Sequence, residues 1–417
     1  MSENPNPPEQ KLITTEESSK KENEDVKIQV PIEIKSEESK ISAEVKSSTP
    51  EPVKEWSVFE LPPDSGFEKI DIDIIKKIQT NSGEIKPIIY ELFEKILGIC
   101  QNKFNFMKEK PSFEQYLAFY QEVNRLIPTL KVKIQREDCY SSVFYIGDTH
   151  GSIEDTFLLV DFFWKLIQKD PLVKFIFVGD YVDRNPWDLE NLTLITAFHL
   201  LCPNNVILLR GNHEDRSINE HYGFIDNLLR WYHENGEPLY NEIIKYFTHL
   251  PIINIVQMYN KEKQVAARVL ATHGGIPIDW QNFLEPLILE KIEDQLHCDR
   301  ERSEEMGPLC NSILWSDPDE MTQNIVTDGD TGRLKFGLSV FQRFMQANNL
   351  HMLVRGHQKW NEGYRAFFGN TLYSLFSTSK YDDKKKFEPK ILQLALGKNV
   401  NIIDIKADRL ESEFKSY

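Results

Sequence analysis

Residues 143–151 read VFYIGDTHG, a short apolar run that passes directly into a glycine-flanked turn carrying Asp148 and His150. The run is rich in aromatic and β-branched side chains, which is typical of a buried strand. The same design recurs as FIFVGDYVDR at 175–184, VILLRGNHE at 206–214, VLATHGG at 269–275 and MLVRGH at 352–357. In open α/β sheets, ligand sites form just beyond the carboxyl ends of the strands. The five stretches therefore predict one site built from Asp, Asn and His side chains.

The region 141–405 alternates such apolar runs with helical segments, which indicates a layered α/β architecture. Ahead of it, Ile88, Leu92 and Ile96 recur at helical spacing after Pro87, a residue suited to the first turn of a helix. This rhythm predicts that residues 56–140 form a helical lead-in that packs on the 141–405 domain.

The two ends of the chain have a different composition from its middle. Residues 1–55 consist largely of Glu, Lys, Ser, Pro and Asn, and such a segment buries too little apolar surface to offset the entropy of ordering. We therefore predict a disordered tail at 1–55. Residues 406–417 are assigned to a short C-terminal tail.

Overall composition narrows the possible partners. Of 417 residues, 49 are Lys or Arg and 65 are Asp or Glu, which gives a net charge of −16. This balance argues against binding to nucleic acid or to an anionic membrane. Neither a secretory leader nor a long apolar stretch is evident, so we expect a cytoplasmic location, with the nucleus as a second option. The scattered cysteines, without a CxxC pair, indicate reduced thiols at positions 100, 139, 202, 298 and 310.

The polar residues of the five turns suit a borderline-hard metal such as manganese, iron or zinc. The candidate ligands are Asp148, His150, Asp180, Asn212, His273 and His357. Asp148 and His150 lie two residues apart in an extended turn, so both side chains can point the same way. Asp180 can bridge two ions through its two carboxylate oxygens. Two ions about 3.5–4 Å apart polarise a phosphoryl oxygen and generate a hydroxide nucleophile.

A proton donor and a phosphate ligand lie beside these residues in the sequence. His213 follows the candidate ligand Asn212, and its imidazolium could protonate the leaving oxygen of a phosphate ester. Asp183, on the neighbouring turn, is placed to orient that imidazole and to favour its charged form. Arg184 can donate forked hydrogen bonds to phosphate oxygens.

The order and spacing of GDTHG, GDYVDR and RGNHED resemble the phosphoprotein phosphatase family, the dinuclear-metal serine/threonine phosphatases that include calcineurin. Further landmarks are SIN at 217–219, YGF at 222–224, LWSDP at 314–318, RGHQ at 355–358 and LFS at 375–377. The resemblance covers about residues 140–405. It implies a central β-sandwich of two mixed sheets flanked by helices.

The resemblance also implies a role for each matching position. It places Asp148, His150 and Asp180 on one metal, and Asp180, Asn212, His273 and His357 on the other. It makes His213 the general acid paired with Asp183, puts Arg184 and Asn212 on the substrate phosphate, and sets Tyr222 and Tyr381 beside the substrate groove. The family's second phosphate-binding arginine has no match in register. Arg333, in the displaced segment DTGRLKFG at 330–337, is the candidate for that role.

The resulting hypothesis is a metal-dependent protein serine/threonine phosphatase, a phosphoric monoester hydrolase that uses two divalent ions. Manganese is the expected metal, with iron or zinc as alternatives. The expected partners are phosphoprotein substrates, and regulatory protein subunits are an open option. Two alternatives remain: a small-molecule metallophosphoesterase of the dinucleoside polyphosphate hydrolase type, and a catalytically impaired scaffold. The LWSDP, YGF and LFS segments favour the protein phosphatase over the first of these.

Overall fold

The computed structural model describes residues 87–101, 106–126, 133–279, 285–296, 298, 306–381, 385–396 and 400–417. The predicted disordered tail at 1–55 lies outside the described residues, as does the part of the predicted lead-in at 56–86. No helix of the described part has the length and apolar character that crossing a membrane requires.

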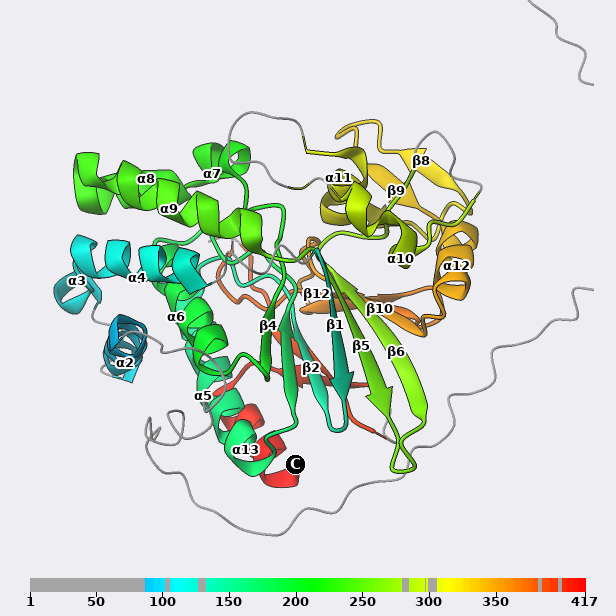
Figure 1. The fold of residues 1–417 in the computed structure, drawn as a ribbon, viewed down its shortest axis with the longest axis horizontal. Coiled ribbons are helices and arrows are strands. Elements are labelled where there is room, and N and C mark those ends of the chain that lie inside the picture. The colour runs from blue at the N-terminus through cyan, green and yellow to red at the C-terminus, as the bar shows by residue number, and fades with distance from the viewer. Residues whose placement is uncertain are drawn as a thin grey trace, which may run out of the picture. The chain divides into compact units, whose positions relative to one another are not determined.

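Two mixed sheets form the centre of the described region (Figure 1). The six-stranded sheet has the order β1 (Ile134–Cys139), β5 (Ile253–Tyr259), β6 (Val265–Thr272), β10 (Met352–Arg355), β12 (Leu372–Leu375), β11 (Tyr364–Phe367). The five-stranded sheet has the order β14 (Asn401–Asp404), β13 (Lys390–Leu394), β2 (Val143–Ile146), β3 (Lys174–Phe177), β4 (Val206–Leu208). This arrangement confirms the predicted sandwich of two mixed sheets.

Strand direction brings the polar turns to common edges. β2, β3 and β4 pair in parallel, so their carboxyl ends lie side by side. β6 and β10 are parallel neighbours in the other sheet. The two sheets pack through side chains that alternate along the strands, and the shared core includes Tyr145, Ile176, Ile207, Val256, Val269 and Val354.

Helices cover both outer faces of the sandwich, as predicted. On the five-stranded sheet, Phe144 and Phe175 pack into one core with α5 (Ile153–Lys169) and α6 (Asp188–Leu201). On the six-stranded sheet, a separate core includes residues of α11 (Pro308–Trp315) and α12 (Leu338–Ala347). The other α-helices among the described residues of the 141–405 region are α7 (Arg216–Tyr222), α8 (Phe224–Tyr232), α9 (Gly236–His249) and α10 (Leu289–Ile292).

The predicted lead-in is helical only in part. It contains α2 (Pro87–Gln101), α3 (Phe106–Glu109) and α4 (Phe113–Leu126), and Pro87 begins the first of these as expected. α2 contacts α6, and α4 contacts α9. However, β1 also falls within 56–140 and adds an edge strand to the six-stranded sheet. Its polar sequence IQREDC buries only its first and last side chains, so it lacks the apolar run that identified the other strands.

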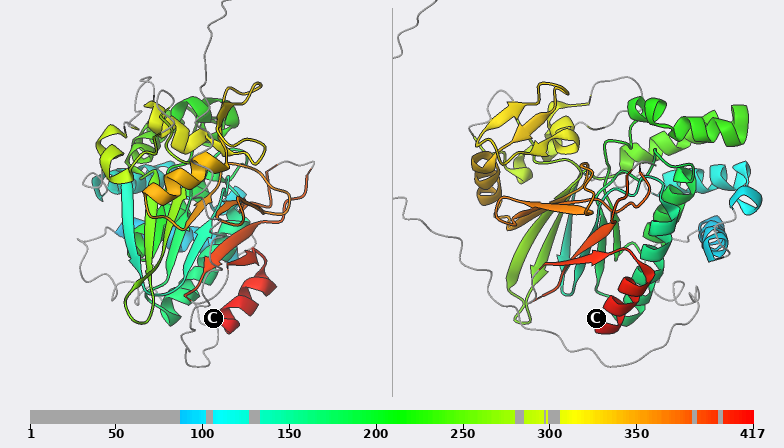
Figure 2. Two further views of the ribbon diagram at one scale, coloured as in Figure 1. Left: turned by 90° about the vertical axis from the view of Figure 1, so that its right-hand side faces the viewer. Right: turned by 180° about the vertical axis from the view of Figure 1, so that it is seen from behind.

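Three other features differ from the sequence analysis. The C-terminal tail contains a helix, α13 (Ala407–Ser416), which packs along α5 (Figure 2). Cys298 and Cys310 form a disulfide, so the prediction that all thiols are reduced is wrong for this pair. A small third sheet, which was not predicted, consists of β7 (Asp317–Pro318), β9 (Leu334–Phe336) and β8 (Ile325–Thr327).

Candidate metal centre

The predicted ligands converge from turns that follow β2, β3, β4, β6 and β10. Asp148, His150, Asp180, Asn212 and His273 are all buried, and His357 is half-buried. Contacts between turns hold them together, since the Gly356 amide donates to the His273 carbonyl at 3.0 Å. The five turns thus form one centre, as the sequence predicted.

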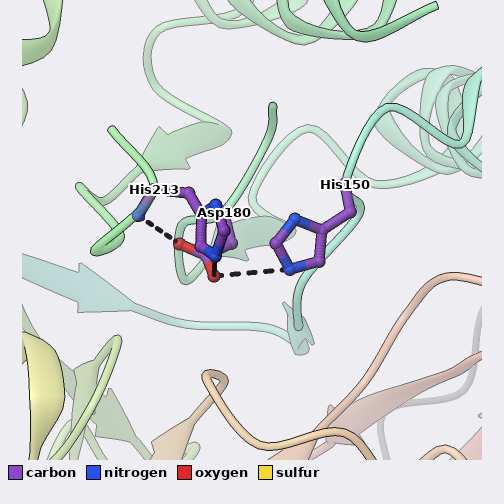
Figure 3. Close-up of side chains that lie close together, drawn as sticks. All are labelled: His150, Asp180 and His213. Carbon is purple, nitrogen blue, oxygen red and sulfur yellow. Dashed lines mark hydrogen bonds and ion pairs between the residues drawn. The ribbon is translucent and has the colours of Figure 1, made fainter. Parts of the chain in front are cut away.

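Asp180 lies at the middle of this centre (Figure 3). Its Oδ2 atom is 3.5 Å from His150 Nε2, and its Oδ1 atom is 3.2 Å from His273 Nε2. Among the described residues, two groups approach closely enough to share an ion: His150 with Asp180 and His213, and Asp148 with Asp180 and His273. Asp180 belongs to both groups, which is the geometry that a bridging carboxylate needs. The ligand-atom distances group Asp148 with His273, rather than with His150 as the family resemblance implied.

Backbone carbonyls fix the orientation of two imidazoles. His150 Nδ1 is 2.9 Å from the Val182 carbonyl, and His273 Nδ1 is 2.9 Å from the Val178 carbonyl. A carbonyl only accepts, so each Nδ1 carries the proton and each Nε2 presents its lone pair to the centre. Metal-ligating histidines commonly have such a partner on the second nitrogen.

The donor atoms around Asn212 fit a cation. Asn212 Oδ1 is 2.7 Å from His273 Nε2 and 2.8 Å from His357 Nδ1. Because His273 Nε2 presents a lone pair, two acceptor atoms face each other at hydrogen-bonding distance. His357 Nε2 is buried without a hydrogen-bond partner. A metal ion near these atoms would satisfy lone pairs that the protein groups themselves leave facing one another.

Burial shifts the pKa values of ionisable groups in the centre. Burial, followed by the negative charge of Asp180, raises the pKa of Asp148 to about 8. Burial, followed by the neighbouring His213, lowers the pKa of His150 to about 3 and so keeps this imidazole neutral. A neutral imidazole is the ligating form, and a bound cation would favour ionised Asp148.

His213 and Asp183 form the pair that the sequence predicted. His213 Nδ1 is 2.7 Å from Asp183 Oδ2, and Asp183 also accepts from Asn219 Nδ2 and from the Phe224 amide. Burial acts to lower the pKa of His213, but the charges of Asp180 and Asp183 outweigh it, and the net shift is upward. His213 Nε2 faces the centre, 4.0 Å from Asp180 Oδ2. The charges of Asp180 and Asp183 therefore favour the protonated imidazole, and its outer nitrogen is directed at the candidate metal site.

The predicted substrate-side residues border this centre. The guanidinium of Arg184 lies 4.2 Å from the ring centre of Tyr222 and 5.0 Å from that of Tyr381. The Tyr222 ring is 5.2 Å from the His213 ring, and the Tyr381 ring is 5.1 Å from the His150 ring. Arg184 adopts a positive φ of 76°, an uncommon conformation for this residue type. The chain thus bends sharply to present this cation beside the ligands.

Arg333 lies near the centre, directly before β9 of the small third sheet. Its guanidinium is 4.9 Å from the ring centre of Trp315, and that ring lies 5.5 Å from the His357 ring. The displaced segment 330–337 therefore does place its arginine near the candidate ligands. Trp315, in the LWSDP segment, thus contacts both Arg333 and His357.

Glu214 is a functional residue that the sequence analysis did not assign. Its Oε2 atom accepts from the amides of Asp180 at 2.8 Å and Gly211 at 2.7 Å, and its Oε1 atom accepts from Tyr181 at 2.8 Å. The carboxylate thus joins the turn after β3 to the turn after β4. At Gly211, a Cβ atom would collide with Asp180 Oδ1, which explains why glycine precedes Asn212. The acidic residue in RGNHE was the only sequence signal for this role.

Comparisons with known proteins agree with this geometry. The family model of the calcineurin-like phosphoesterases matches residues 141–360. The catalytic subunit of serine/threonine-protein phosphatase 6 from Caenorhabditis elegans is 33% identical over 61% of this chain and 70% of that protein. A probable serine/threonine-protein phosphatase of Encephalitozoon cuniculi is 34% identical over 58% of this chain, and the match spans 48% of that relative.

The fold has a counterpart among solved structures. A protein serine/threonine phosphatase from Saccharomyces cerevisiae, described as similar to human phosphatase PP5, superimposes with a TM-score of 0.59. The superposition covers 75% of this chain and 95% of the yeast chain at 22% sequence identity. At that level of identity, the likeness supports the fold.

Proposed function

Since the chain belongs to the calcineurin-like phosphoesterases, and by its relatives to the serine/threonine-protein phosphatases among them, we propose that it hydrolyses phosphoserine and phosphothreonine esters in proteins. The observation that carries the proposal is the central position of Asp180, between two groups of metal-ligating atoms and beside the His213–Asp183 pair. The resemblance found in the sequence pointed to the same family.

We assign the ligands as follows. Asp148, His150, Asp180, Asn212, His273 and His357 would hold two metal ions, and Asp180 would contribute to both groups of ligands. When bound, the ions would polarise the phosphoryl group and activate the attacking water. Carboxylate, amide and imidazole donors suit manganese, and iron or zinc are the alternatives.

The protein groups then have distinct tasks during hydrolysis. Arg184 and Asn212 orient the phosphate, and Arg333 approaches it from the opposite side. His213 donates the proton on Nε2 to the serine or threonine oxygen as the ester bond breaks. Asp183 holds the imidazole through Nδ1 and favours its protonated form. Tyr222 and Tyr381 border the groove in which the substrate lies.

We also propose partners and a location for the protein. Phosphoproteins are the substrates, regulatory subunits are candidate partners, and the cytoplasm, with the nucleus, is the proposed location. The acidic net charge of −16 supports the exclusion of nucleic acid as a partner.

Substrate class tests the proposal directly. We expect the purified chain with added Mn²⁺ to hydrolyse a phosphoserine peptide and to leave diadenosine tetraphosphate largely intact. Released phosphate and nucleotide products would be measured under the same conditions. Preferential cleavage of the dinucleotide would favour the small-molecule phosphoesterase. Inactivity toward both compounds and toward p-nitrophenyl phosphate would favour the scaffold.

Asp183→Asn is expected to shift the pH dependence of phosphopeptide hydrolysis. Asp183 favours charged His213, so its loss lowers the pKa of that imidazole. A general acid works only while protonated, so activity is lost as pH rises through its pKa. The high-pH fall in kcat should therefore move to lower pH, with kcat reduced about tenfold or more near neutrality. An unchanged pH profile would remove Asp183 from this role.

A further inference from the structure

Lys359 is a third cation near the candidate site, in addition to Arg184 and Arg333. It follows the RGHQ segment, two residues after His357, and its side chain is exposed. Its ammonium lies 5.3 Å from the ring centre of Tyr381, and the guanidinium of Arg184 lies 5.0 Å from the same ring centre. The Tyr381 ring in turn contacts the His150 ring. Arg184 and Lys359 therefore flank one aromatic side chain next to the metal ligands.

Among the residues that the structure describes, neither of these two cations pairs with a carboxylate. In the described part of the chain, the side chains of Arg184 and Lys359 form no ion pair, although acidic residues outnumber basic ones by 65 to 49. Lys380, in the same loop as Tyr381, shows the usual alternative, because its ammonium pairs with Glu154 at 2.5 Å. Arg184 and Lys359 thus place two like charges, without an ion-pair partner among the described residues, on a surface beside the centre. Such a surface attracts anions.

The hydrolysed phosphate accounts for the positive charge of Arg184 but not for that of Lys359. In the proposed function, Arg184 and the metal ions already hold the phosphate that is hydrolysed. Lys359 approaches Tyr381 from a different segment of the chain and is free to contact a separate group. Neighbouring residues of an extended peptide are about 3.5 Å apart, so an anionic side chain one or two residues from the phosphorylated one can reach it.

We propose that Lys359 is a specificity-determining residue that binds a second anionic group close to the phosphorylated serine or threonine. The proposal rests on the proposed function and adds to it a substrate class: phosphopeptides with a neighbouring acidic side chain or a second phosphate. The Tyr381 ring holds the ammonium in place by a cation–π contact, which reduces the entropy lost on binding.

Three matched phosphoserine peptides test this proposal: one with neutral flanks, one with glutamate next to the phosphoserine, and one with a second phosphoserine there. Their kcat/KM values would be compared for the wild type, Lys359→Met, Lys359→Arg and Lys380→Met at low ionic strength. The readout is the ratio of each anionic peptide to the neutral one within each variant, so differences in overall rate cancel.

We expect the wild type to favour both anionic peptides by about three- to tenfold, mainly through KM. Lys359→Met should bring the ratio close to one. Lys359→Arg should retain the preference because it keeps the charge, and Lys380→Met should retain it because that lysine is already paired. Added salt should weaken the wild-type preference by screening. A preference for only one anionic peptide also supports the proposal and identifies carboxylate or phosphate as the preferred group.

Two results would overturn this inference alone. One is equal turnover of all three peptides by the wild type. The other is a Lys359→Met variant that loses activity equally on all three, which would place the lysine on the hydrolysed phosphate or in the fold. If the wild type cleaves none of the peptides, the proposed function itself fails, and this inference fails with it.

Discussion

Asp180→Asn is expected to lower kcat for a phosphoserine peptide by on the order of a thousandfold or more, and to reduce the bound metal. Asparagine keeps the shape of the side chain but replaces one anionic oxygen with an NH₂ group, which cannot ligate a cation. In the structure the two oxygens face different histidines, Oδ2 toward His150 and Oδ1 toward His273. Loss of either oxygen therefore removes a donor from one group of ligands, and loss of the negative charge weakens metal binding by both groups.

Metal analysis and thermal unfolding would check this expectation alongside the rate. Because a metal that binds only the folded state stabilises it, added Mn²⁺ should raise the Tm of the wild type. The same addition should have little effect on the Tm of Asp180→Asn. Asp226→Asn is a matched control, because Asp226 is exposed on α8. A variant with the wild-type metal content would show that Asp180 does not bridge the ions.

His213→Ala is expected to lower phosphopeptide turnover by about 10²–10⁴-fold while most of the metal content is kept. The serine or threonine oxygen is a strongly basic leaving group and needs the proton that His213 Nε2 supplies. A p-nitrophenolate leaving group is weakly basic, so hydrolysis of p-nitrophenyl phosphate should fall much less. The difference between the two substrates separates proton donation from a general loss of the site.

His213 could instead act as a metal ligand, and the same variant tests this alternative. His213 is close enough to His150 and Asp180 to share an ion with them. If it were a ligand, His213→Ala would lose metal in parallel with activity, and the rates of hydrolysis of both substrates would fall equally. The exposed His221 provides a control, since His221→Ala removes an imidazole whose one hydrogen bond among the described residues is to the Ser217 carbonyl.

The position of the ligands could be predicted because each strand carries its own polar turn. Asp148, Asp180 and His273 directly follow apolar runs, so a local pattern identifies both the strand and the residue at its end. Parallel pairing then brings these ends together. The prediction of one converging centre therefore needed little long-range information, whereas the sandwich of two sheets was implied by the family resemblance.

Features that depend on tertiary contacts were not predictable in this way. The Val178 and Val182 carbonyls that orient two imidazoles carry no side-chain signal at all. β1 is a strand because it pairs with β5, although its own sequence is polar. The approach of Cys298 to Cys310 likewise follows from the packing around α11, since cysteine spacing gave no indication of a pair.

The strand order has a consequence for biosynthesis. β13, from the far end of the chain, pairs with β2 in the five-stranded sheet, and His357 follows β10 late in the sequence. A nascent polypeptide that has emerged only as far as β6 therefore lacks both a neighbour of β2 and one of the candidate ligands. Such distant pairings form slowly during folding. The set of candidate ligands is thus complete only after translation has passed β10.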